Sequence, residues 1–482
     1  MNVQAVAVVI AAVLGVATLL ACTCSFLYSW FIVRPLKLHP SGQRLPPGSV
    51  GWPLFGEMRE FLQCFKNEKP DQFVKIREKR YGTGGLYTTS MFGVPSIMAT
   101  TPDMLKFVLK RDDLFGPGWP SLSKIMGPAA VVSVTGELHK TLRRYLFDAI
   151  ASPEGMVKAL PRLDEAMRTN LKEWADQGNV NIRECTRKLT FHVIAANFLN
   201  LKPSPELQLM EKDYIGFMIG IRALPLYLPG TAHYTAVNCR RRLSARFQAL
   251  INHRRSSKEY QGDFLQSLMD ARDPDGLPLT DEQLKDNLVA LMLAGYESSA
   301  YIMMWTLILL AKHPQCLSKL REEHVHIKRR IGESQLTLED TRDMIYTQMV
   351  IDETLRLVNV APMLFRTVLQ DVDFNGYRIP KGWRVMPWLR APHMDPQYFP
   401  QPEKFNPERW NDKNVKSEAF RPFGGGARTC VGNAFARLQV SVFLHHVSVG
   451  YKWALLNPDA KIDHLPHPKP VDGGPMFFSA LA

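Results

Sequence analysis

The sequence predicts a mainly α-helical fold with a minor β component, and three observations support this prediction. Helical patterns dominate the chain from about Asp103 to Val358. Strand-like runs form two short hairpin patterns, one from Leu86 to Thr100 and one around Asn375-Gly376. A long apolar stretch, Asp281 to Lys312, ends shortly before Pro314 and indicates one helix. We therefore expect one mostly helical body with small sheets.

The composition is that of an ordinary globular protein. The chain has 482 residues, of which 46% are hydrophobic and 22% charged, so wholesale disorder and small disulfide scaffolds are excluded. Its seven cysteines form no Cys-x-x-Cys pair, which argues against a disulfide framework or a zinc site and favours a reducing compartment. The formal net charge of +13 favours an acidic partner, anionic lipid or nucleic acid without choosing among them.

The first 33 residues predict a membrane anchor. No charged side chain occurs from Val3 to Val33, and this run exceeds the roughly 20 residues that span a bilayer. Arg34 and Lys37 follow it, which places the body on the cytosolic side. A cleaved signal peptide is the alternative, weakened because no Lys or Arg precedes the run. We expect an anchor at 1–33, a basic, proline-rich hinge at 34–56 and a catalytic domain at 57–482.

The helix from Asp281 to Lys312 is the most informative element. It opens with a capping box, Thr280 to Gln283, and would be roughly 48 Å long at 1.5 Å per residue. It is apolar nearly all round, so it is either a buried core helix or a second membrane span. Glu297 lies near its middle, where a carboxylate at the bilayer centre would cost about 2.5–3.5 kcal/mol. We therefore predict a buried core helix.

Polar groups interrupt this helix at Ala294-Gly295-Tyr296-Glu297-Ser298-Ser299. Glycine and serines can loosen the local hydrogen-bond ladder and leave backbone and hydroxyl groups for a water or a ligand. A satisfied polar spot in a kinked helix is the alternative interpretation.

A glycine-rich loop carries the clearest motif, Phe423-Gly424-Gly425-Gly426-Ala427-Arg428-Thr429-Cys430-Val431-Gly432, ahead of a helical pattern. The amides and dipole of a helix N-terminus favour a thiolate, glycines let a flat cofactor approach, and Arg428 can bind its carboxylate. A phosphate loop is excluded because no Gly-Lys-Ser/Thr follows. The loop resembles that of the cytochrome P450 family, whose Phe-x-x-Gly-x-Arg-x-Cys-x-Gly pattern it matches at every defined position.

Two further motifs extend the resemblance. Glu353-Thr354-Leu355-Arg356 and Pro407-Glu408-Arg409-Trp410 precede the cysteine loop in the family's order. A lone Glu-x-x-Arg is an ordinary surface pair, but this order is far more specific. The resemblance implies that Glu353, Arg356 and Arg409 form a cluster that supports the cysteine loop.

The resemblance also implies the fold and the cofactor. It implies the cytochrome P450 fold, with the long central helix over a haem b whose iron has Cys430 as its axial ligand. The resemblance implies that His139, Arg143 and Arg366 contact the haem propionates. At each of these positions, a solvated basic residue is the alternative interpretation. The cofactor-binding residues implied beside Cys430 are His139, Arg143, Arg366, Arg428, Phe423 and Gly424.

As a family member, the chain would be a monooxygenase that uses dioxygen. Glu297 and Ser298 would be the acid–alcohol pair that delivers protons. No Gly-x-Gly-x-x-Gly fingerprint occurs, so electrons from NADPH would come through a separate P450 reductase, which a basic face with Lys140, Arg143 and Arg144 could dock. The expected location is the endoplasmic reticulum membrane, single-pass. A haem-binding sensor or electron carrier, or a haem isomerase, is the alternative that the acid–alcohol pair disfavours.

Several stretches look like the plant ent-kaurenoic acid oxidases of gibberellin biosynthesis, among them Ile379-Pro380-Lys381-Gly382-Trp383. This branch implies multi-step oxidation of ent-kaurenoic acid towards gibberellin A12; the alternative is a triterpenoid or steroid hydroxylase of the same family. Departures include Tyr296 for a usual histidine and Val431 for a usual proline. The basic triplets at 240–242 and 328–330 indicate solvated helix faces and not a nucleic-acid site, because they lack interleaved aromatics.

Overall fold

The structure is a computed structural model that describes residues 44–481 except 53, 54, 120–124, 222, 224–226, 258, 274, 413, 414, 416 and 466. Before residue 44 it describes residues 12, 15, 16, 18–20, 22, 23 and 27, which are helical and exposed. The rest of the predicted anchor, with Arg34 and Lys37, lies outside the described residues. The anchor therefore stays a prediction.

The chain packs as two compact units. The smaller unit joins Met1–Gly118 to Pro362–Pro392, and the larger joins Trp119–Ala361 to His393–Ala482. Each unit is described by itself. The expected catalytic domain, 57–482, contributes residues to both units, and its boundaries stay a prediction.

The smaller unit holds both predicted hairpins. The first has an antiparallel register that runs from Leu86↔Ala99 to Met91↔Val94. The second closes at Asn375 and Gly376, whose φ angles of 50° and 78° are those that such a tight turn needs. Both hairpin predictions are confirmed. The main sheet has the order β1 (Leu86–Met91), β2 (Val94–Ala99), β8 (Arg384–Pro387), β5 (Arg366–Val368), β3 (Phe115–Pro117), and the second hairpin is β6 (Val372–Phe374) with β7 (Tyr377–Ile379).

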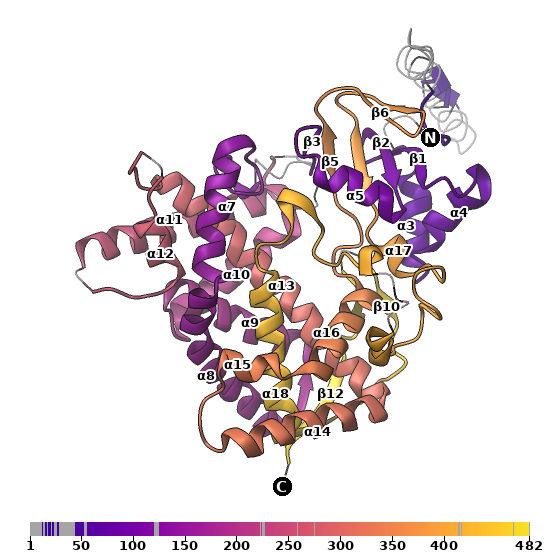
Figure 1. Cartoon of the computed structure of the whole chain (residues 1–482). Coiled ribbons are helices and arrows are strands. Elements are labelled where there is room, and N and C mark those ends of the chain that lie inside the picture. The colour runs from indigo at the N-terminus through magenta and orange to yellow at the C-terminus, as the bar shows by residue number, and fades with distance from the viewer. Residues whose placement is uncertain are drawn as a thin grey trace, which may run out of the picture. The chain divides into compact units, whose positions relative to one another are not determined.

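Helices cover this sheet. Met104 and Val108 lie one turn apart on one helix and pack into the same apolar cluster as Ile97 and Val385 of the strands. This helix, α5, labelled in Figure 1, packs on β8 of the sheet. The helices of the unit are α3 (Met58–Lys66), α4 (Gln72–Tyr81), α5 (Pro102–Lys110) and α17 (Arg390–His393), the last of which ends at the boundary of the unit.

The larger unit is mostly helical, as predicted, and three-stranded and two-stranded sheets complete it. Its helices are α7 (Gly136–Ile150), α8 (Pro153–Gln177), α9 (Ile182–Leu199), α10 (Pro205–Ile221), α11 (Ala232–Ser256), α12 (Phe264–Asp270), α13 (Asp281–Lys312), α14 (Pro314–Ile331), α15 (Leu338–Arg342), α16 (Ile345–Val358) and α18 (Asn433–Gly450). Its strands are β4 (Asn179–Asn181), β12 (Pro475–Ala480), β9 (Tyr451–Leu455), β10 (Ile462–Asp463) and β11 (Lys469–Pro470).

Helix α13 runs through the core of this unit and has the predicted bounds. Both halves of the capping box form between Thr280 and Gln283. Its length and composition would suit a membrane span, but 72% of its apolar stretch is buried inside the protein. It packs on α9, α11, α16 and α18 (Figure 1). The prediction of a buried core helix is therefore confirmed.

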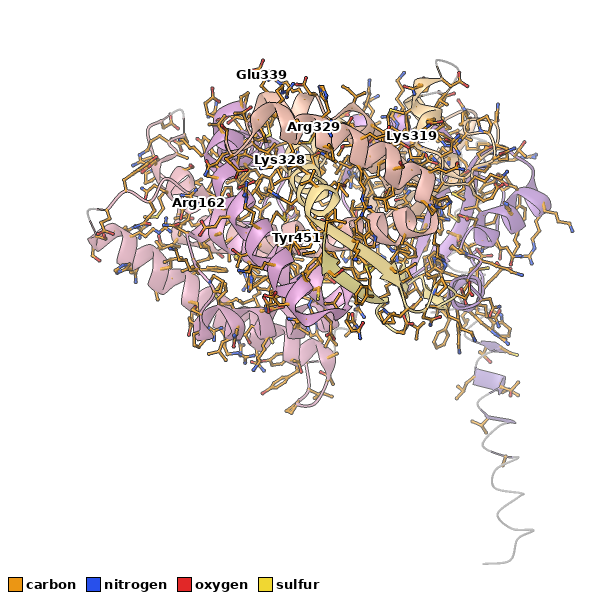
Figure 2. The ribbon with its side chains drawn as sticks, turned by 90° about the horizontal axis from the view of Figure 1, so that it is seen from below. Arg162, Lys319, Lys328, Arg329, Glu339 and Tyr451 are labelled. Atoms are coloured by element: carbon orange, nitrogen blue, oxygen red, sulfur yellow. The ribbon has the colours of Figure 1, made fainter. Side chains whose placement is uncertain are left out.

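The two basic triplets serve as pairing partners for acids. Arg240 of α11 donates to Asp286 of α13, and Arg242 donates to Asp213 of α10. The side chain of Arg240 is only 23% exposed, so the prediction of a solvated face is wrong at this position. Lys328 and Arg329 lie on α14 in Figure 2, and Lys328 donates to the Gly332 carbonyl at its C-terminal end.

Buried histidines link four helices of the larger unit. His324 Nδ1 of α14 lies 3.2 Å from His445 Nδ1 of α18, and His324 Nε2 lies 3.0 Å from Thr347 Oγ of α16. The neighbouring His446 lies 2.6 Å from the Asp164 carboxylate of α8. Burial lowers the pKa of His324 to about 3 and that of His445 to about 4. Both imidazoles are therefore neutral at pH 7.

These depressed values predict a loss of stability in acid. The unfolded chain binds protons at His324 and His445 below pH about 6.5, whereas the folded chain does not. The free energy of unfolding therefore has its full value above that pH. As the pH drops towards the pKa values of the folded state, it falls by about 1.4 kcal/mol per pH unit for each histidine. The free energy of unfolding, measured with urea between pH 7 and 5, should therefore decrease as the pH falls. His324→Gln should reduce the slope of this dependence by the equivalent of about one proton.

The exposed His326 on the same helix supplies the matched control. We expect His326→Gln to keep the parent slope, because this change leaves the buried His324 and His445 untouched. An unchanged slope in His324→Gln would contradict the prediction.

Candidate active site

The cysteine loop precedes α18 and is held by its own backbone. The Cys430 amide donates to the Phe423 carbonyl over 3.0 Å, which closes the loop. Gly424 and Gly426 have φ angles of 76° and 69°, a left-handed conformation that side chains other than glycine adopt poorly. The spacing of the glycines is therefore explained by the path of this loop.

Cys430 is open to solvent, although protein surrounds the thiol on its other sides. Burial raises the pKa of the thiol, and a hydrogen bond from the Gly432 amide and the charge of Arg143 lower it by less. The amide at the start of α18 thus favours the thiolate, as expected, but by less than burial disfavours it. A coordinated metal ion would ionise this thiol, because a coordinating thiol is deprotonated outright.

Two arginines lie beside this thiol. Arg143 of α7 is half-buried; burial lowers its pKa, the Cys430 thiol raises it, and Arg428 of the loop lowers it. Arg428 also donates to the Val134 carbonyl over 3.0 Å. His139 lies one turn before Arg143 on α7 and is 4% exposed. The structure thus brings Arg143, Arg428 and Cys430 together, as the resemblance implied.

Helix α13 is mostly buried, but a short stretch near its middle is exposed. Ala294 and Ser298, one turn apart, are exposed, and Glu297 is half-buried. Ser298 Oγ donates to the Ala294 carbonyl over 2.7 Å. The helix is continuous through residues 294–299, so the loosened ladder suggested by the sequence is not seen. Gly295 instead permits close packing, because a Cβ there would lie 2.9 Å from Ile194 Cδ1 of α9.

Tyr296 is fully buried and packs between two aromatic rings. Its ring lies 5.3 Å from that of Phe191 on α9 and 5.9 Å from that of Tyr214 on α10. Burial raises its pKa well above the ordinary value, and its hydroxyl has no hydrogen-bond partner among the described residues. The replacement of the usual histidine by Tyr296 therefore lies at a packing position. It does not lie on the exposed face of the helix that carries Ser298.

The Glu-Arg-Arg residues form a buried ion cluster. Glu353 Oε1 accepts from Arg356 over 2.8 Å and from Arg409 over 2.9 Å. Glu353 and Arg356 are 0% exposed and Arg409 is 7% exposed. Arg356 also donates to the carbonyls of His393 and Pro402. The cluster therefore ties α16 to the chain that leads towards the cysteine loop.

His393 completes this link, and the sequence reasoning missed it. Its Nε2 accepts the Arg421 amide over 3.0 Å at the start of the cysteine loop, and its Nδ1 lies 3.0 Å from the Asn359 amide. A single histidine without a motif gave no signal in the sequence. Arg437 of α18 was missed too; it pairs with Asp352 and lies 5.4 Å above the Phe423 ring.

Arg366 belongs to the smaller unit, where it lies on β5 and is 8% exposed. Its guanidinium donates to the Phe365 carbonyl over 3.2 Å. Its predicted contact with a propionate stays a prediction.

Comparison with known proteins identifies the family. The family model described as "Cytochrome P450" matches residues 46–471. The chain belongs to the cytochrome P450 family. It is 39% identical to ent-kaurenoic acid oxidase 2 of Arabidopsis thaliana over 92% of each chain, and 34% identical to β-amyrin 11-oxidase of Glycyrrhiza uralensis over 95% of this chain and 96% of that one.

A solved structure agrees in fold. Retinoic acid-bound cyanobacterial CYP120A1 superimposes with a TM-score of 0.81 at 30% identity, over 91% of this chain and all of that one. The P450 fold predicted from the motifs is confirmed. As a P450, this chain is a monooxygenase that carries a haem and works with a redox partner, a substrate and dioxygen.

The residues of the larger unit fit a haem. The open Cys430 thiol can ligate iron, and the glycines of its loop leave room for a flat ring. Arg143 and Arg428 lie close enough to repel each other, and carboxylates placed between them would relieve that repulsion. Bound haem supplies the iron at which dioxygen is activated, while the protein supplies the ligand and the cations.

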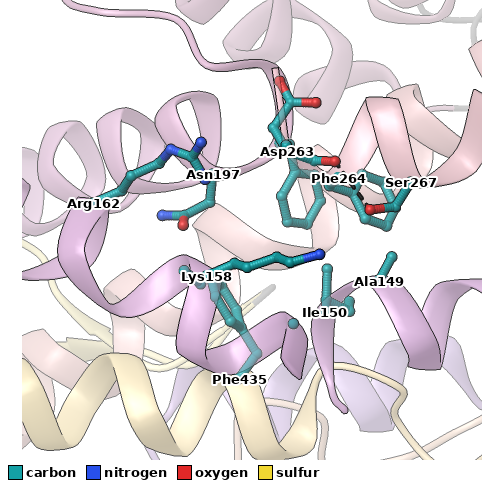
Figure 3. Close-up of a pocket in the computed structure, with 13 residues that line it drawn as sticks. Ala149, Ile150, Lys158, Arg162, Asn197, Asp263, Phe264, Ser267 and Phe435 are labelled. Atoms are coloured by element: carbon teal, nitrogen blue, oxygen red, sulfur yellow. Dashed lines mark hydrogen bonds between the residues drawn. The ribbon is translucent and has the colours of Figure 1, made fainter. Parts of the chain in front are cut away.

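A small cavity in the same unit has a different character. It has a volume of about 20 Å³, roughly the space of one water, and the Asn197 amide oxygen that lines it has no hydrogen-bond partner among the described residues. Figure 3 shows Lys158, Arg162 and Phe435 around it. The cavity suits a structural water and is too small for an organic substrate.

The buried ion cluster predicts a steep cost for Glu353→Gln. The change leaves Arg356 and Arg409 buried without their carboxylate, which should cost about 3–5 kcal/mol of stability and release the cysteine loop. Urea unfolding and the thiolate-type Soret band of the reduced, carbon monoxide-bound protein would both report it. The matched control, Glu408→Gln, breaks an exposed pair with Lys319 and should cost less than about 1 kcal/mol. Equal effects of the two changes would contradict the prediction.

The assignment of the iron ligand predicts a spectroscopic change. Reduced protein under carbon monoxide should show the thiolate-type Soret band, and Cys430→Ala should abolish it because no other thiolate replaces the ligand. Cys316→Ala, at a half-buried cysteine of α14, should retain the band. A band that survives in Cys430→Ala would overturn the assignment.

Proposed function

We propose that this P450 is a membrane-anchored haem-thiolate monooxygenase that oxidises ent-kaurenoic acid in several steps towards gibberellin A12. The observation that carries this proposal is the near full-length identity with an ent-kaurenoic acid oxidase, together with the P450 site in the larger unit. A hydrophobic diterpenoid acid suits an enzyme whose long helix is apolar around one polar opening.

The residues of the chain divide the work of oxidation. Cys430 would hold the iron as its thiolate ligand, and the bound haem would supply the site at which dioxygen is activated. Ser298 and Glu297 deliver protons from the exposed face of α13. Ser298 Oγ now donates to the Ala294 carbonyl, so its hydroxyl must rotate before it can donate to a bound water or substrate oxygen. A half-buried Glu297 can then reprotonate it.

Basic side chains would fix the position of the haem relative to Cys430 and Ser298. Arg143 and Arg428 would pair with the propionates, and His139 would donate beside Arg143. The resemblance implies a propionate contact for Arg366 as well. Phe423 and Gly424 would lie against the ring on the side of Cys430. Glu353, Arg356 and Arg409 act at one remove, because they hold the chain that leads to the loop.

The partner and the location complete the proposal. Electrons would come from NADPH through a separate cytochrome P450 reductase, which would dock on the exposed basic residues Lys140 and Arg144 of α7. Residues 1–33 would anchor the chain in the endoplasmic reticulum membrane with the catalytic domain in the cytosol. The exposed, helical Val16, Leu19 and Leu20 are consistent with a lipid-facing segment.

A triterpenoid substrate is the second candidate, because β-amyrin 11-oxidase shares 34% identity with this chain. The two substrates differ in charge, because ent-kaurenoic acid carries a carboxylate and β-amyrin does not.

Product analysis tests the choice. The full chain is co-expressed with a plant reductase, supplied with NADPH, and fed ent-kaurenoic acid or β-amyrin in parallel. We expect oxidised products from the diterpenoid only, and none from Cys430→Ala. Turnover of β-amyrin alone would overturn the substrate and leave the chemistry standing; full activity on a peroxide without NADPH would overturn the monooxygenase mechanism.

A further inference from the structure

Asp286 of α13 is a buried carboxylate that no part of the mechanism above uses. It lies eleven positions before Glu297 and is 3% exposed. Its Oδ2 accepts the Ala129 amide over 3.1 Å, and its Oδ1 accepts Arg240 of α11 over 2.5 Å. One side chain thus joins α13, α11 and the segment 127–131.

The next residue, Asn287, binds the same segment. Its Oδ1 accepts the Val131 amide over 2.9 Å, and its Nδ2 donates to the Ala129 carbonyl over 3.2 Å. The second hydrogen on Nδ2 is satisfied by the Gln283 carbonyl over 2.8 Å. Asn287 is 1% exposed, and two of the three hydrogen bonds of its side-chain amide hold the loop on the helix.

Gly127 shows how closely the segment follows Asp286. Its φ angle is +109°, and a Cβ there would lie 2.1 Å from the carboxyl carbon and oxygen of Asp286. Any side chain at position 127 would displace the carboxylate or the loop. Residues 127–131 are therefore shaped around Asp286 and Asn287.

The segment 127–131 leads to the two arginines that are proposed to bind the haem propionates. The Val134 amide donates to the Ala130 carbonyl over 3.2 Å, and the Val134 carbonyl accepts Arg428 over 3.0 Å. Helix α7, which carries Arg143, begins two residues later at Gly136. The position of both arginines beside Cys430 therefore depends on a segment that α13 holds in place.

We propose that Asp286 and Asn287, with Arg240, are positioning residues that hold the segment 127–134 on α13 and thereby place Arg143 and Arg428 for the haem propionates. The three act through the loop and do not touch the cofactor themselves. This role is independent of the substrate, but it rests on the proposed pairing of Arg143 and Arg428 with the haem propionates.

The role predicts a cofactor defect that appears without substrate. Asp286→Asn removes the charge that Arg240 and the Ala129 amide use, and Asn287→Ala removes both contacts with residues 129 and 131. Each variant should transfer haem to apomyoglobin about fivefold faster or more, an effect of the size of a lost buried hydrogen bond. The iron reduction potential should also fall, because cations near the propionates favour the reduced, less positive iron.

Asp281 supplies the matched control on the same helix. It accepts Arg255 and Gln248, so Asp281→Asn also breaks a carboxylate–arginine pair between α13 and α11, but at a site that does not contact residues 127–131. We expect parent rates of haem transfer and the parent potential in Asp281→Asn. A loss of structure alone would accelerate haem transfer in proportion to the fall in the unfolding midpoint, without a separate shift of the potential.

Further variants keep the test decisive where Asp286→Asn does not fold. Arg240→Lys preserves the cation and should retain haem nearly as the parent does, whereas Arg240→Ala should lose it faster. Combining Asn287→Ala with Arg428→Lys should cost less than the two single changes together, because both act on one contact path. The proposal is overturned by parent-like haem transfer and potential in Asn287→Ala and Arg240→Ala, or by an equal defect in Asp281→Asn.

Discussion

The buried pairing of one carboxylate with two guanidiniums is the constraint on which the cysteine loop depends. Charges placed out of water need polar partners, and Glu353 accepts from both Arg356 and Arg409. One carboxylate leaves one positive charge in excess, and backbone carbonyls that accept from the two arginines stabilise it. The remaining donors of Arg356 bind carbonyls of the chain around residue 393, whose imidazole then holds the start of the loop. The position of the loop that carries Cys430 thus depends on an ion cluster whose carboxylate lies on another helix, α16.

Helix α13 solves a different problem, which is to bring polar chemistry into an apolar core. Most of its circumference is packed against neighbouring helices, and this packing fixes its position as a rigid rod. The helix exposes Ser298, which is proposed to deliver protons, and twelve residues earlier it carries Asp286, which binds the segment 127–131. The proposed proton delivery and the position of the loop therefore depend on the same helix.

Much of the fold and the site could be predicted because the signals were local. Caps, turn dipeptides and apolar periodicity gave α13 and both hairpins, and the cysteine loop carries its residues within ten positions. The cluster of Glu353, Arg356 and Arg409 came from resemblance, since spacing alone does not distinguish it from a surface pair. His393, Arg437 and Asp286 were missed because their partners lie 28 to 157 positions away and no motif marks them.

The same limit explains where predictions failed. Arg240 was expected in water because its neighbours are arginines, but the fold buries an acid opposite it. At Cys430 the sequence indicated that the helix N-terminus favours the thiolate, but it gave no sign of the burial that outweighs the amide and the arginine. In both cases the deciding influence is the three-dimensional environment, which the order of residues does not state.

The one-sided opening of Cys430 has a practical consequence for handling the protein. Among the described cysteines, only Cys22 and Cys430 are exposed, and Cys64 and Cys239 are buried. A metal–sulfur bond would occupy the open side of Cys430, so an alkylating reagent should modify this thiol only in molecules that lack the cofactor. Mass spectrometry of the alkylated peptide could then count the empty fraction of a preparation directly, without reference to its colour.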